Sequence, residues 1–127
     1  MYATQMQAYR NAPKAEMSDR EIDAHALTQS ALKLRDCQQN WDKPDNEKIH
    51  RLFEALRLNS FLWSIFQAQI SADGNQLPRQ LREDLLTLSL FVDKRTREIM
   101  FSPEPDKLSL LININLNIAA GLKASPA

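Results

Sequence analysis

A long amphipathic stretch between residues 45 and 72 constrains the fold more than any other feature of this 127-residue chain. Asp45 or Asn46 can cap its first turn, and Asp73-Gly74-Asn75 supplies turn chemistry at its end. Its apolar residues recur at the three- and four-residue spacing of one helix face, and they are Ile49, Leu52, Phe53, Leu56, Trp63, Phe66 and Ile70. The pattern predicts a long helix that buries one face against other elements.

A second helix is predicted before this one, from a cap at Ser18 to about Asn40. Ser18 with Glu21 has the spacing of a capping box. The apolar face that follows consists of Ile22, Ala26, Leu27, Ala31, Leu34 and Cys37. The segment Trp41-Asp42-Lys43-Pro44 reads as the turn between the two helices.

A third long helix begins at Pro78, which suits the first helical position because its missing N–H would have no partner there. It ends before the prolines of the 102–105 segment. One face carries Leu81, Leu85, Leu88, Val92 and Ile99, while Leu86, Leu90 and Phe91 add apolar surface elsewhere. A helix so apolar around its circumference is either central in the fold or meets a partner.

The last apolar segment, residues 108–118, fits two patterns. Alternating leucine and isoleucine residues match a strand, whereas a helical spacing with Gly121 near its C-terminal cap matches a helix. A lone strand needs a partner strand, and no convincing one is present. We therefore predict a helix, with the strand as the alternative. With a short helix over 1–11, the chain is predicted to be one all-α domain, 1–127: a small bundle of three long helices, a C-terminal helix and a short N-terminal one.

Composition narrows the classes of function. Sixteen basic residues balance sixteen acidic ones, which argues against direct binding of nucleic acid or a membrane surface. Only two glycines are present, which disfavours a β-sandwich or a phosphate-binding loop. A single cysteine, no signal-peptide pattern and no run of about 18 apolar residues predict a cytoplasmic protein.

No group of side chains predicts catalysis, a metal or a cofactor. His25 and His50 have no second ligand at metal spacing, and Cys37 lies on an apolar face as an inert thiol would. Adjacent acids such as Glu83 and Asp84 point in different directions on a helix. We therefore expect a protein that binds another protein and is not an enzyme.

Several large side chains are candidates for that role. Trp63 and Phe66 belong to an apolar face, as core residues or as anchors of a partner helix. Phe61, Leu62 and Phe91 fall off the main faces, which favours a surface covered only in a complex. Asn59 and Asn115 interrupt apolar faces, so each predicts a specific polar contact, internal or with a partner.

The chain resembles the flagellar regulator FlaF family in an ordered series of segments. Residues 55–63, with Asn59, Leu62 and Trp63, resemble its "AL-x-x-N-x-x-L-W" stretch. Residues 75–82, the "SL-aromatic-V" segment in 88–93 and the closing "LI-x-x-N…GL" pattern of 111–122 follow in order, and Ala8-Tyr9 matches near the N-terminus. Ser60 and Phe61 stand where relatives often carry arginine or another polar residue.

The resemblance implies a cytoplasmic factor in flagellum assembly that binds flagellin, through its amphipathic terminal segments, as a regulator of flagellin synthesis or an export chaperone. On this reading Tyr9, Phe61, Leu62 and Phe91 are contact candidates, while Trp63 and Asn59 shape the groove. The alternative is a post-transcriptional regulator that acts on flagellin messenger RNA, directly or through a partner such as FlbT.

Overall fold

The computed structural model describes residues 19–42, 45–75 and 77–124. These ranges hold four α-helices and one short 3₁₀ turn: α2 (Asp19–Gln39), α3 (Asn46–Ser71), α4 (Arg79–Phe101), η1 (Pro105–Lys107) and α5 (Leu108–Ala124). No strand occurs in them, so the predicted all-α bundle is confirmed. The predicted N-terminal helix with Tyr9, and the cap at Ser18, lie outside the described residues.

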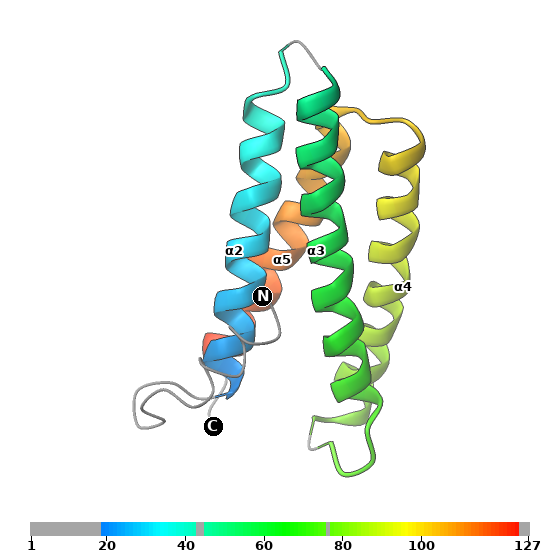
Figure 1. The fold of residues 1–127 in the computed structure, drawn as a ribbon. Helices are drawn as coiled ribbons and strands as arrows, with labels where there is room; N and C mark the ends of the chain where they lie inside the picture. The colour runs from blue at the N-terminus through cyan, green and yellow to red at the C-terminus, as the bar shows by residue number, and fades with distance from the viewer. Residues whose placement is uncertain (1–18, 43–44, 76, 125–127) are drawn as a thin grey trace.

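Helix α3 stands between α2 and α4, and α5 runs behind α2 and α3 (Figure 1). Helix α5 packs chiefly on α2, whereas α4 packs on α3 and barely touches α5. Helix α4 is therefore at the edge of the bundle. The apolar circumference of α4 was predicted to mean either a central position in the fold or contact with a partner. The edge position excludes the first of these explanations.

The helix boundaries follow local chemistry. The Asp45 carboxylate accepts a hydrogen bond from the Lys48 amide at 2.8 Å and caps α3, so Asp45 is the cap among the two candidates, Asp45 and Asn46. Gly74 turns the chain after α3 with a φ of +82°, a conformation that glycine adopts without strain. Pro78 is the cap of α4, and Arg79 is its first residue, so the predicted start was early by one residue.

The C-terminal segment is a helix because one helical face accounts for its burial. Leu108, Leu111, Ile112, Asn115 and Ala119 are buried, and they recur at the helical spacing of three and four. Leu110, which the strand pattern placed with the buried set, is 39% exposed. The 3.6-residue period thus decides the ambiguity.

The face of α4 that packs on α3 differs from the predicted one. It consists of Leu85, Ser89, Val92, Thr96 and Ile99, spaced alternately by four and three residues. Leu81 was predicted on this face but is 43% exposed, near the start of the helix. Thr96 enters the interface because its hydroxyl donates to the Val92 carbonyl oxygen at 2.7 Å, which satisfies a buried polar group locally.

Candidate partner-binding groove

A buried polar network joins α2, α3 and α5. The Trp63 indole Nε1 donates to Asn115 Oδ1 at 2.9 Å. Asn115 Nδ2 donates to Asn59 Oδ1 at 2.7 Å and to the Leu27 carbonyl oxygen at 3.2 Å. The Ser30 hydroxyl donates to the same Asn59 oxygen at 2.9 Å. All five residues are buried, so these contacts hold three helices in one register.

The Trp63 indole N–H decides which atom donates and which accepts in the hydrogen bonds that the two asparagines make with each other and with Trp63. An indole N–H can only donate, so Asn115 must turn its oxygen toward Trp63 and its NH₂ toward Leu27 and Asn59. Asn59 must then turn its oxygen toward Asn115, which leaves its own Nδ2 buried with no hydrogen-bond partner among the residues that the structure describes. The specific polar contact predicted for Asn59 and Asn115 is therefore internal, and it fixes the seam between α2 and α3 from behind.

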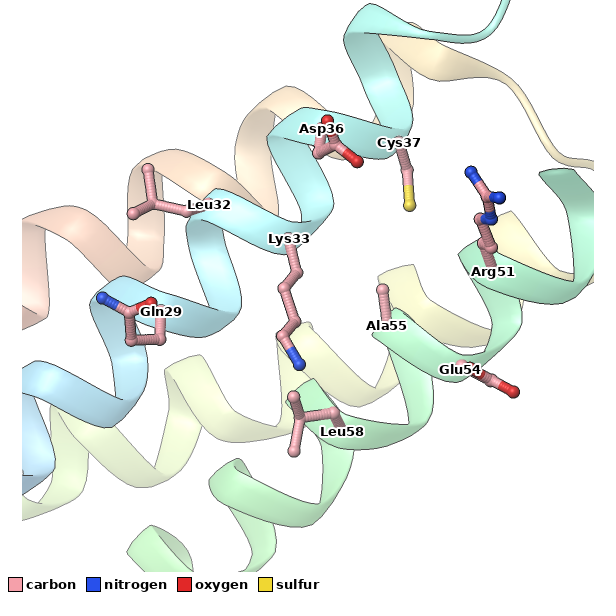
Figure 2. Close-up of a pocket in the computed structure, with 9 residues that line it drawn as sticks. All are labelled: Gln29, Leu32, Lys33, Asp36, Cys37, Arg51, Glu54, Ala55 and Leu58. Carbon is pink, nitrogen blue, oxygen red and sulfur yellow. The ribbon is translucent and has the colours of Figure 1, made fainter. Parts of the chain in front are cut away.

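A groove of about 520 Å³ lies along that seam, and we call it the α2–α3 groove. It is lined by Gln29, Leu32, Lys33, Asp36 and Cys37 of α2 and by Arg51, Glu54, Ala55 and Leu58 of α3. Figure 2 shows Ala55, Leu58 and the Cys37 thiol directed into the gap, with Lys33 extending across it toward Leu58. The floor is thus largely apolar and the charges lie at the mouth.

Most charged groups at the mouth already have partners. Glu54 contacts His50 Nε2 at 2.7 Å, and Arg51 pairs with Glu47. Asp36 accepts a hydrogen bond from the Asn40 side chain at 3.0 Å. Within the described part of the chain, Lys33 forms no ion pair or hydrogen bond through its side chain.

Large apolar side chains remain exposed in the groove lining and beside it. Leu32 on α2 is 43% exposed and Phe61 on α3 is 46% exposed. Leu58, Phe61 and Ile65 are spaced by three and four residues, so they form one stripe along α3. Ile65 also lines a small cavity of about 20 Å³ on the same seam, with Ala26 of α2. The apolar stripe therefore continues beyond the groove.

The predicted contact residues fall in different places. Phe61 lies beside the groove, while Trp63 and Asn59 are buried behind it. Phe91 is half-buried on α4, which does not line the groove, and the Arg95 guanidinium stands 5.7 Å from its ring centre. Tyr9 lies outside the described residues.

Leu62 was predicted to lie off the apolar faces, but it is buried. It faces α2 and lines the small cavity on the seam with Ala26 and Leu27. The expectation failed because α3 is packed by neighbours on several sides, so its buried surface is wider than a single stripe. Leu32, Leu58 and Lys33 were missed as groove residues, since only the docking of α2 on α3 brings them together.

The alkylation rate of the Cys37 thiol is a measure of the environment inside the groove. Burial and the nearby Asp36 carboxylate raise the pKa of the Cys37 thiol, and Arg51 only partly opposes them. Because the thiolate is the nucleophile, we expect iodoacetamide to alkylate Cys37 several-fold more slowly at pH 7.5 than a free thiol. The rate should rise to a plateau at a higher pH than for the same chain unfolded in guanidinium. Equal pH–rate profiles for the folded and unfolded chain would contradict this.

Other types of site find no support in the described residues. In residues 19–42, 45–75 and 77–124, no group of three His, Cys, Asp or Glu side chains is placed to hold a metal ion. No helix in these ranges has the length and apolar character needed to cross a bilayer.

Comparison with known proteins gives one match, and it covers nearly the whole chain. No curated protein and no solved structure matches. The sequence model described as "Flagellar protein FlaF" matches residues 5–122, which include α2 to α5 up to Leu122. That range contains every segment on which the resemblance in the sequence was based. The chain therefore belongs to the FlaF family of flagellar proteins.

Proposed function

We propose that this protein acts in flagellum assembly by holding an amphipathic terminal segment of flagellin in the α2–α3 groove. The observation that carries the proposal is the exposure of Leu32 and Phe61 beside a groove with an apolar floor. Neither residue belongs to the hydrophobic core cluster of the described residues. Exposed apolar surface of this kind is typical of binding sites.

Flagellin ends are amphipathic and unfolded before assembly, so they need protection until export. An amphipathic helix can lay its apolar face between α2 and α3, with anchors at the three- and four-residue spacing. Trp63 and Asn59 support the groove by fixing the positions of the helices. Phe91 and Tyr9 remain further contact candidates. On this proposal the protein works in the cytoplasm as an export chaperone, a regulator of flagellin synthesis, or both.

Replacing Phe61 with alanine tests the proposal, with Phe101→Ala as the matched control. Phe101 is 92% exposed at the end of α4, away from the groove. In calorimetric titrations with monomeric flagellin, Phe61→Ala should weaken binding about tenfold, as an interface anchor does. Phe101→Ala should leave the affinity unchanged.

Equal effects of the two substitutions would place the binding site elsewhere. Absence of a complex with flagellin at micromolar concentration would contradict the proposal altogether. If flagellin messenger RNA were then retained, alone or through an FlbT-like partner, the post-transcriptional alternative would be favoured. Direct RNA contact would show a steep fall in affinity with salt.

A further inference from the structure

Lys33, at the mouth of the α2–α3 groove, has no partner among the described residues. From this we infer that the accepted segment carries a carboxylate beside its apolar face, and that this carboxylate pairs with Lys33. The inference rests on the proposed function, because it names the chemistry of the segment that the groove takes. It commits to an acidic amphipathic helix as the occupant.

Lys33 differs from the other charged residues of the groove. Arg51 pairs with Glu47 and Glu54 contacts His50, both within α3. Asp36 accepts a hydrogen bond from Asn40, just after α2, whereas the Lys33 ammonium has no partner within the described residues. Figure 2 shows the Lys33 side chain reaching from α2 toward Leu58, above the apolar floor. Lys33 is thus a lining cation without a carboxylate partner among the described residues, and it lies next to the surface that an apolar helix face would cover.

Binding makes that charge a determinant of specificity. A helix seated on Ala55 and Leu58 removes water from around the Lys33 ammonium, and a desolvated charge without a partner is costly. A carboxylate on the incoming helix offsets this cost, whereas a lysine at the same place adds repulsion. The groove should therefore select between amphipathic segments that have the same apolar face.

Two synthetic helical peptides test this selection. They share one apolar face, and they differ only in carrying glutamate or lysine at the positions that flank it. The readout is the rate at which iodoacetamide alkylates Cys37, which lines the groove and is the chain's one cysteine. We expect the acidic peptide to slow alkylation about fivefold more than the basic one at equal concentration, and added salt to reduce the difference.

Lys33→Gln should abolish the preference for the acidic peptide. Lys94→Gln is the matched control, because Lys94 is an exposed lysine on α4 and does not line the groove. Equal protection by both peptides, protection by neither, or a preference that survives Lys33→Gln would each overturn the inference. Protection of Cys37 in the absence of any peptide would also overturn it. Protection that rises with protein concentration would indicate a second copy of the chain as the occupant. Protection that is relieved by Tyr9→Ser would indicate the chain's own N-terminal segment.

Measuring flagellin binding distinguishes a failure of this inference from a failure of the proposed function. If flagellin binds but Lys33→Gln and Lys33→Glu leave its affinity unchanged, the inference fails and the proposed function stands. If flagellin does not bind while the acidic peptide protects Cys37 in a Lys33-dependent manner, the proposed function fails and the chemistry of the groove stands.

Discussion

The Asn115→Asp variant should lose about 5 kcal/mol of its free energy of unfolding at pH 7: about 4 kcal/mol is the cost of a carboxyl whose pKa is raised by about three units in a fully buried site, and about 1 kcal/mol comes from a lost hydrogen bond. Asn115 is completely buried, and its NH₂ group faces two acceptors, the Asn59 amide oxygen and the Leu27 carbonyl oxygen. A carboxylate would put an acceptor against both of them. Burial and these two oxygens all favour the protonated form of the introduced carboxyl.

The pH dependence of this loss has a definite sign. The folded pKa of the introduced carboxyl lies above its unfolded value of about 3.9, so the folded state binds the proton more tightly. The loss relative to the wild type should be small below about pH 4, grow as pH rises through the unfolded pKa, and level off above the folded pKa. A residual cost of about 1 kcal/mol should remain at low pH, because the protonated carboxyl donates only one hydrogen bond where the amide donates two.

Urea denaturation followed by circular dichroism from pH 4 to pH 8 measures this dependence. The matched control is Asn117→Asp, since Asn117 lies two residues further along α5 and is exposed. It should change the free energy of unfolding by less than about 0.5 kcal/mol at every pH. A loss for Asn115→Asp that is the same at pH 4 and pH 7 would show that the introduced carboxyl does not titrate in a buried site.

Leu34→Ala and Leu32→Ala should separate stability from binding. Leu34 is fully buried, whereas Leu32, on the same helix, is 43% exposed at the groove. Leu34→Ala should cost about 2–5 kcal/mol of unfolding free energy through lost burial and the cavity left behind. Leu32→Ala should cost less than about 1 kcal/mol and weaken flagellin binding about fivefold as an anchor at the interface.

Denaturation and calorimetric titration of both variants, under conditions where each is folded, give the comparison. The folded Leu34→Ala protein should keep the wild-type affinity for flagellin. If Leu32→Ala binds as the wild type does while Leu34→Ala binds weakly, the apolar groove residues do not contact the partner.

The helices themselves could be predicted because each carries its own signal. Periodic apolar residues, the Asp45 cap and the turn at Gly74 act over a few residues, and the structure confirms the three long helices and the C-terminal helix that were predicted. The position of α4 at the edge could not be predicted, because an apolar circumference does not say which neighbour covers it. The exposure of Leu90, at 63%, became visible only with the fold.

The two buried asparagines of the site could be predicted from the sequence, whereas their pairing and the groove could not. Asn59 and Asn115 stood out because a polar residue on an apolar face must find a partner. Their pairing across 56 residues depends on how α5 crosses α3, and a local pattern does not encode that. The groove was missed for the same reason: Lys33 and Leu58 become neighbours only after two amphipathic helices have docked.

The crossing of α5 behind α2 and α3 also bears on synthesis of the chain. Trp63 and Asn59 are translated long before residue 115. The nascent helices therefore emerge from the ribosome with an indole that has not yet met its acceptor and with an Asn59 oxygen that can accept from Ser30 but not yet from Asn115. Only when the C-terminal helix has left the exit tunnel can the three-helix interior close and the groove acquire its fixed walls. A polypeptide that still lacks α5 therefore lacks the interior that fixes α2 against α3, and on the proposed function it could not yet hold its partner segment.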